Sequence, residues 1–197
     1  MKVKEGLTPK LPPMEPGVYL AVCVGVIGIG EQYDKWANEY QNKVMLVWEI
    51  PSETVEINGK QETRLQDKEF KWSDYETSNL RSVASTLMGR SFSDTEFRNF
   101  DLDDLVGTSC QIQVVQSSTG KSSYVKSVVA LPKGFPIPKA TVTPMIWWAK
   151  KWNDEAFAKL PEWIQHRIKK STQYQKEHAP ETEIKIETPA TEGVCPI

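Results

Sequence analysis

Short apolar segments rich in β-branched residues, each bounded by turn-forming residues, limit this chain to a fold built mainly from strands. The segment Val18–Ile27 is almost wholly apolar and follows Pro16-Gly17, which favours a buried strand over a buried helix. The segment Lys43–Ile50 places apolar residues at every second position, as expected for a strand with one face on a core. No apolar run reaches the length of about 18 residues that a membrane helix requires, so no membrane span is expected.

Later segments continue the strand pattern. Asn58-Gly59 is the strongest short hairpin signal in the chain, and it separates the strand-like residues 54–57 and 62–65. Phe70 and Trp72 alternate with charged residues and, like Trp48 before them, are predicted to face the core. Three further segments are predicted as strands: Lys68–Trp72, Ser109–Val115 and Tyr124–Leu131.

One part of the chain has a helical period instead. An apolar stripe recurs between residues 78 and 88, and Gly89 is placed to cap the C-terminus of the resulting helix. Ser93–Phe100 is predicted to add a short helical turn, because Ser93 and Glu96 have capping-box spacing. The residues of the apolar stripe are Leu80, Val83, Ala84 and Leu87.

The residue types that carry catalysis are scarce in this chain. It has 3 cysteines and 2 histidines, and the cysteines lie far apart. Cys23, Cys110 and Cys195 fit neither a disulfide framework nor a zinc site, and we predict reduced thiols with the first two in the core. Since no paired-carboxylate or histidine-centred motif is visible, we expect no enzymatic activity, no metal site and no cofactor.

Charge is distributed unevenly along the chain, although the formal net charge is only −2. Residues 1–138 carry a net charge of −3, residues 139–178 of +4 and residues 179–197 of −3. Proline-rich stretches lie near the boundaries between these parts of the chain. We therefore predict a flexible N-terminal arm (1–15), a globular domain (16–138), a basic, tryptophan-rich helical segment (139–178) and a disordered acidic tail (179–197).

The predicted elements of the globular domain follow the order strand, strand, strand, helix, strand, strand. Five or six strands with a single helix between the third and the fourth are the layout of an OB-fold barrel. Residues 16–138 also resemble the OB-fold single-stranded DNA-binding proteins of bacteriophages. The resemblance lies in the order and spacing of five stretches: Pro16–Ala21, Val44–Ile50, Ser78–Val83, Asp104–Cys110 and Val125–Val128.

This resemblance implies a protein that binds single-stranded DNA largely without sequence preference and protects it during phage replication or recombination. It also implies a cytoplasmic location, in the bacterial host if the protein is phage-encoded. The N-terminal residues Met1–Gly6 lack the apolar stretch of a signal peptide, which agrees with that location. The sequence leaves open whether RNA is bound and whether the chain forms a homo-oligomer.

An OB barrel binds single strands through its second and third strands and through the loops that join strands 1–2 and 4–5. Sequence-tolerant binding requires aromatic rings on which bases stack and cations that follow the phosphates. The stretch Gly28–Asn42 is predicted to be the first of these loops. The candidate DNA-binding residues are Tyr33, Lys35, Trp36, Tyr40, Lys43, Arg64, Lys68, Lys71, Lys121, Tyr124 and Lys126.

Among these candidates the aromatic residues are expected to stack on bases and the cations to meet phosphates. Three acidic residues in the same loop dilute its positive charge, so binding should depend more on stacking than on charge. Two alternatives remain open. Trp36 and Tyr40 are four residues apart and also fit the apolar stripe of a short helix packed on the barrel. Lys68 and Lys71 also fit a solvated strand face.

Residues 143–174 have a helical pattern and contain a cluster of tryptophans and lysines. Three interpretations compete for this segment. It covers the barrel as a lid, it binds the phosphates and bases of the strand, or it docks a partner protein, since tryptophan is enriched at interface anchors. The third makes the chain a protein-interaction module for a replication partner. The cluster consists of Trp147, Trp148, Lys150, Lys151 and Trp152.

The C-terminal tail ends in Glu192–Ile197, with proline followed by an apolar residue. It resembles the acidic tips through which bacterial single-stranded DNA-binding proteins recruit replication proteins. The resemblance implies replication or recombination proteins as partners of the tail. An inert disordered end is the alternative.

Overall fold

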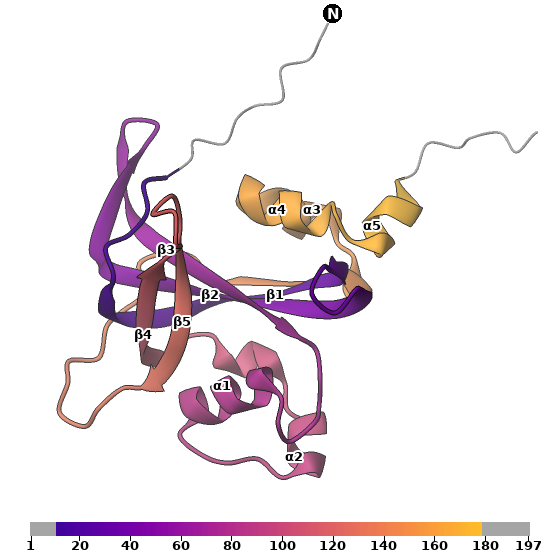
Figure 1. Ribbon diagram of the computed structural model, residues 1–197, viewed down its shortest axis with the longest axis horizontal. Coiled ribbons are helices and arrows are strands. Elements are labelled where there is room, and N and C mark those ends of the chain that lie inside the picture. The colour runs from indigo at the N-terminus through magenta and orange to yellow at the C-terminus, as the bar shows by residue number, and fades with distance from the viewer. Residues whose placement is uncertain (1–10, 179–197) are drawn as a thin grey trace, which may run out of the picture.

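The strands of the protein form one open sheet (Figure 1). A computed structural model describes residues 11–178 and shows a mainly β protein. Neighbouring strands follow the order β3-β2-β1-β4-β5, and β6 pairs with part of β1. Within the described residues, β3 and β5 at the two ends of this order are not paired with each other. The strands are β1 (Gly17–Asp34), β2 (Glu39–Ile57), β3 (Lys60–Lys71), β4 (Ser109–Gln116), β5 (Ser123–Ala130) and β6 (Met145–Trp148).

Strand β1 connects the two halves of the sheet. Its first part, Gly17–Val22, pairs with β4, and the part from Val22 to Asp34 pairs with β2, both in the antiparallel sense. The register with β2 shifts next to Gly25 and again before Gly30, and such irregularities bend a strand. The strand predicted over Val18–Ile27 is confirmed, but it continues further than predicted.

The prediction of a loop between the first two strands is wrong, because most of Gly28–Asn42 forms a β-hairpin. β1 and β2 stay paired as far as Asp34 and Glu39, and only residues 35–38 form a turn. The Asp34 carboxylate accepts hydrogen bonds from the backbone N–H groups of residues 36 and 37, and Asn38 adopts a φ of 53°. This turn chemistry also rules out the alternative of a short helix over these residues.

The other predicted strands and turns are largely confirmed. The hairpin at Asn58-Gly59 joins β2 to β3, and both residues have positive φ angles of 53° and 78°. β2 and β3 are longer than the short segments suggested by the sequence. The predicted strands 109–115 and 124–131 agree with β4 and β5 to within one residue.

Both predicted helical segments before β4 are confirmed. The Ser78 side chain caps the first helix, and Gly89 ends it in the left-handed region with a φ of 65°. Ser93 and Glu96 form the predicted capping box of the second. Among residues 11–178, no helix combines the length and apolarity needed to cross a membrane. The elements are α1 (Asn79–Met88), α2 (Asp94–Arg98) and the 3-10 helix η1 (Leu102–Leu105).

The helical prediction for residues 143–174 is wrong at its start, where residues 145–148 form strand β6. This strand runs parallel to Gly25–Gly28 of β1. The pairing of β4 with β1 ends at Val22, so the backbone groups of β1 beyond it need other partners. Four helical elements follow: the 3-10 helix η2 (Ala149–Lys151), α3 (Asp154–Lys159), α4 (Glu162–Ile168) and α5 (Thr172–Glu177).

The ribbon formed by β1 and β2 is buried on both faces. Leu46 and Trp48 belong to a core shared with α1, η1 and β4. Met45 and Val47 point to the opposite face and belong to a second core with Ile164 of α4. Figure 1 shows α1 and α2 on one side of the ribbon and α3–α5 on the other. The alternation predicted for this strand is confirmed, and residues 139–178 supply the cover of its outer face.

The cysteines of the described chain are core residues, as predicted. Cys23 and Cys110 are fully buried and unpaired. Burial raises the pKa of both thiols to about 12, so they remain protonated at neutral pH. Cys195 lies outside the described residues.

The described part of the N-terminal arm is held against the body. Met14 is buried, its N–H donates to the Ser123 hydroxyl at 3.1 Å, and its carbonyl accepts from the Gln116 amide at 3.1 Å. Met14, at the end of the predicted N-terminal arm, is therefore fastened to the β4–β5 hairpin. Residues 1–10 and the predicted acidic tail 179–197 lie outside the described residues.

A buried carboxylate fastens the chain before β6 to the outer face of β2. Glu49 is fully buried, and it accepts hydrogen bonds from the Thr63 hydroxyl at 2.8 Å and from the N–H groups of Thr141 and Val142 at 2.8 and 3.2 Å. The Thr141 hydroxyl also donates to it. Burial opposes the charged form, but the hydrogen bonds outweigh this cost and lower the pKa of Glu49.

Replacing Glu49 by alanine should destabilise the protein by about 3 kcal/mol, because buried N–H groups lose their acceptor. Urea unfolding followed by tryptophan fluorescence measures the loss. Glu56→Ala, at an exposed position of the same strand, should cost less than about 0.5 kcal/mol. The stabilisation by Glu49 should be complete above its ordinary pKa and decline as the pH falls through its lowered value. Equal losses in the two variants would contradict this role.

Candidate nucleic-acid interface

The tip of the β1–β2 hairpin presents three aromatic side chains to solvent. Tyr33 and Tyr40 are cross-strand partners whose rings meet edge to face at 5.3 Å between centroids. The Tyr33 hydroxyl donates to the Asn38 side chain at 2.5 Å, which holds the pair against the turn. Trp36 lies in the turn with 99% of its surface exposed. The structure therefore brings together three of the four aromatic candidates on one hairpin.

The cations near this tip are mostly paired with the acidic residues of the same hairpin. Lys43 Nζ lies 2.8 Å from Asp34, and Lys71 Nζ lies 3.5 Å from Glu39. The hydrogen bond from Lys43, together with two backbone N–H groups, lowers the pKa of Asp34 to about 2. Within residues 11–178, Lys35 forms no ion pair. A phosphate that reaches Lys43 or Lys71 has to compete with a carboxylate.

Two predicted phosphate contacts are engaged inside the protein. Arg64 is buried and donates to the backbone carbonyl of Pro12. Lys68 donates to the carbonyl of Lys126 at 2.9 Å, and burial lowers the pKa of Lys68. Lys68 therefore lies in the gap between β3 and β5 rather than on a solvated face. Neither side chain is positioned to contact single-stranded DNA at the hairpin tip.

The remaining candidates lie on the β4–β5 hairpin. Tyr124 has 51% of its surface exposed, and Lys121 and Lys126 are exposed as well. In Figure 1 the turn between β4 and β5 lies on the opposite side of the molecule from the tip of the β1–β2 hairpin. The structure therefore divides the predicted residues into two separate groups. In the part of the chain described, no cluster of three His, Cys, Asp or Glu side chains is arranged to hold a metal ion.

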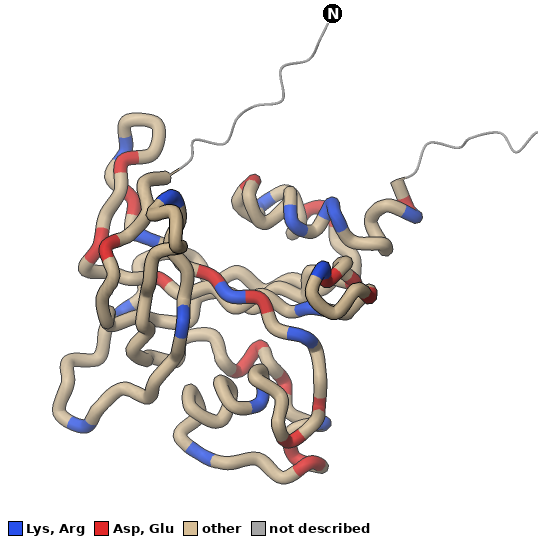
Figure 2. Tube along the Cα trace, in the orientation of Figure 1, with Lys and Arg blue, Asp and Glu red and all other residues tan. Residues whose placement is uncertain are grey.

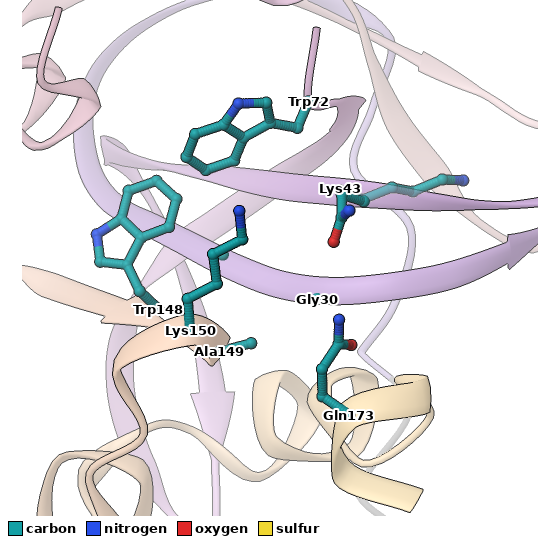
Figure 3. A pocket seen from close by; sticks show the side chains of 9 residues that line it. Gly30, Lys43, Trp72, Trp148, Ala149, Lys150 and Gln173 are labelled. Carbon is teal, nitrogen blue, oxygen red and sulfur yellow. The ribbon is translucent and has the colours of Figure 1, made fainter. Parts of the chain in front are cut away.

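A pocket next to the hairpin brings Trp72 together with Trp148 and Lys150 of the tryptophan and lysine cluster, for which binding of the strand was one of three interpretations. Trp72, predicted to be in the core, is 46% exposed, and its ring meets that of Trp148 edge to face at 5.1 Å. Lys150 Nζ lies 5.6 Å from the centre of the Trp72 ring. Figure 3 shows these side chains converging. We call this cavity of about 100 Å³ the tryptophan pocket; its lining is Gly28, Gly30, Asn42, Lys43, Trp72, Trp148, Ala149, Lys150 and Gln173.

Trp148 is fixed in this pocket from two sides. Its indole N–H donates to the Asp103 carboxylate at 2.9 Å. Its ring lies directly over the backbone of Gly28, where an added Cβ would meet the ring at 2.3 Å. The glycine of β1 is therefore required for the close approach of the indole. A glycine within an apolar strand was the available sequence signal, since it often marks such an approach.

Charge does not gather on one face of the body. Figure 2 shows basic and acidic positions interspersed along the strands, whereas several basic positions occur on α3–α5. One of these cations is paired, since Arg167 contacts Glu69 of β3. The arrangement suits a ligand held by ring stacking with a few cationic contacts.

Comparisons with known proteins give no family for this chain. No protein-family model matches it. No curated protein matches it either.

Replacing Gly28 by alanine should displace Trp148 and destabilise the protein by about 1–3 kcal/mol, as overpacking does in other cores. Urea unfolding measures the change. Gly17→Ala is the matched control, because its Cβ would meet only the Tyr19 ring at 3.2 Å. A Gly28→Ala protein as stable as the Gly17→Ala protein would show that Trp148 does not depend on this contact.

Proposed function

We propose that this protein is a non-enzymatic binder of single-stranded DNA that acts without sequence preference. The observation that carries the proposal is the β1–β2 hairpin, which presents Trp36 almost fully exposed beside Tyr33 and Tyr40. Sequence-tolerant binding of single strands relies on such stacking surfaces, because every base has a π-face. Protection of single strands during phage replication or recombination is the role we propose.

We propose further that residues 16–138 are an OB-type barrel left partly open. Three features support this. The strand order is β3-β2-β1-β4-β5, β1 is shared between the two halves, and α1 lies between β3 and β4 in the chain. The hydrogen bond from Lys68 to the carbonyl of Lys126 brings β3 and β5 together where such a barrel would close. OB-folds are small Greek-key barrels that are often partly open.

The alternative, a protein-interaction module that uses the tryptophans of residues 139–178, has less support. Trp147 is 3% exposed and belongs to the core under α4. Trp152 packs against Phe157 and Tyr174, with ring centres 5.1 and 5.6 Å apart. Trp147 attaches the segment to the sheet and Trp152 packs among the helices of the segment, which favours the lid interpretation. These two side chains are therefore not free to anchor a partner.

The test is a titration of single-stranded and double-stranded oligonucleotides at two salt concentrations. Fluorescence anisotropy of labelled oligo-dT should show binding, with a weaker response for the duplex. The logarithm of affinity should fall with the logarithm of salt by about 0.7 for each phosphate contact, and few contacts are expected because several lysines are already paired. No binding of oligo-dT at low salt would overturn the proposal.

Trp36→Ala should weaken oligo-dT binding roughly fivefold or more, because stacking on one aromatic ring contributes about 1–3 kcal/mol. Its free energy of unfolding should stay unchanged, since the side chain is exposed. Trp36→Phe should restore most of the affinity by keeping a ring. Unchanged binding by Trp36→Ala would remove the hairpin tip from the site.

Asp34→Asn should strengthen oligo-dT binding, because Lys43 loses its carboxylate partner while the amide oxygen still accepts from the turn. The salt dependence should steepen by about 0.7 if the freed lysine meets a phosphate. Glu56→Gln makes the same change of net charge on the β2–β3 hairpin and is the control. Equal effects of both variants would point to overall charge rather than to Lys43.

A further inference from the structure

The tryptophan pocket lies on the same ribbon as the aromatic tip. Asn42 and Lys43 line it and follow Tyr40 by two and three residues along β2. At about 3.3 Å per residue, the pocket begins about 7–10 Å from that tyrosine. Single-stranded DNA that stacks on the aromatic tip can therefore continue into the pocket without leaving the surface of the protein.

The pocket combines an accessible ring with an unpaired cation. About half of the Trp72 side chain is exposed, and Trp148 supports it edge to face. Lys150 is exposed and forms no ion pair among the described residues. Figure 3 shows its side chain beside Trp148, with Nζ reaching toward the Trp72 ring. This differs from Lys43 and Lys71, which carboxylates already engage.

Hydrogen-bond donors face the pocket from the opposite side. The side-chain oxygen of Gln173 accepts from the backbone N–H of Glu31 at 2.8 Å, which fixes the orientation of its amide. Its NH₂ group then points into the pocket, as Figure 3 shows. Gly30 has a φ of 76°, and an added Cβ there would meet the Gln173 oxygen at 2.7 Å, so the backbone leaves room for this amide. Donors at this position suit a ligand with carbonyl oxygens on its edge.

We propose that the tryptophan pocket receives one unstacked base of the bound DNA that carries a ring carbonyl, such as the thymine of oligo-dT. Trp72 provides the stacking surface, the Gln173 amide donates to a carbonyl oxygen of the base, and Lys150 meets a neighbouring phosphate. The pocket of about 100 Å³ is open to solvent and has room for a single base. Residues 139–178 are then part of the DNA site as well as a cover for the sheet. This inference rests on the proposed function.

A base within single-stranded DNA fits this pocket better than a free nucleotide does. Sites for free nucleotides hold the phosphates with backbone N–H groups at a glycine-rich turn or a helix N-terminus. Here Lys150 is the lysine of the lining that forms no ion pair among the described residues, and the pocket lies on the same ribbon as the aromatic tip. One base of a longer ligand is the occupant that this arrangement favours.

Two variants test the pocket by anisotropy with oligo-dT. Trp72→Ala should bind roughly 5- to 150-fold more weakly, the range expected for one lost stacking contact. Lys150→Ala should reduce the slope of the salt dependence by about 0.7. The controls are Tyr75→Ala, an exposed aromatic residue outside the pocket, and Lys60→Ala, at an exposed position at the start of β3. Circular dichroism melting checks that each variant is folded.

Cross-linking of the unmodified protein gives a second readout that does not depend on variant folding. Oligo-dT that carries 5-iodouracil is irradiated in the complex, and mass spectrometry locates the adducts. Adducts on Trp72 or Trp148 support the pocket. Adducts confined to the hairpin tip, together with variants that behave as their controls, overturn the pocket and leave the proposed function standing. A protein that binds no oligo-dT overturns both.

Discussion

The pairing of β6 with the free edge of β1 is the interaction on which the rest of the arrangement depends. It follows directly on the segment that the buried Glu49 carboxylate holds, so residues 139–178 are fixed to the sheet at two neighbouring points. Ile164 is thereby brought over Met45 and Val47, which would otherwise face water. Burial of this apolar surface contributes most of the free energy that holds residues 139–178 on the sheet. The hydrogen bonds determine the position of this segment on the sheet.

This cover limits the surface on which the proposed single-stranded DNA could bind. OB-type barrels bind their ligands on the second and third strands. In the partly open barrel that we propose, α4 lies over part of that face, with Arg167 paired to Glu69 of β3. What stays accessible is the end of the ribbon beyond the cover, with Trp36 at its tip and Trp72 at its side. The site we propose is therefore narrower than an open barrel face, and part of its wall comes from the covering segment.

Most of the strands and both early helices could be predicted from the sequence, because local signals specify them. Ser78 and Gly89 mark the ends of α1, and Asn58-Gly59 marks a hairpin. Strand β6 could not be predicted, because its pairing depends on an edge of β1 that only the fold leaves free. The exposure of Trp72 was missed for a similar reason. It lies just beyond the end of β3, where the alternation of the strand no longer decides its environment.

The neighbouring tryptophans of β6 show how one short strand serves both packing and the site. Consecutive side chains of a strand point to opposite faces. Trp147 therefore enters the core beneath the C-terminal helices, while Trp148 turns toward Trp72 and the solvent-facing pocket. In the sequence the two residues belong to one aromatic cluster, which suggests that they share one role. Strand geometry divides them, so the contact that anchors residues 139–178 also places an indole beside the proposed path of the DNA.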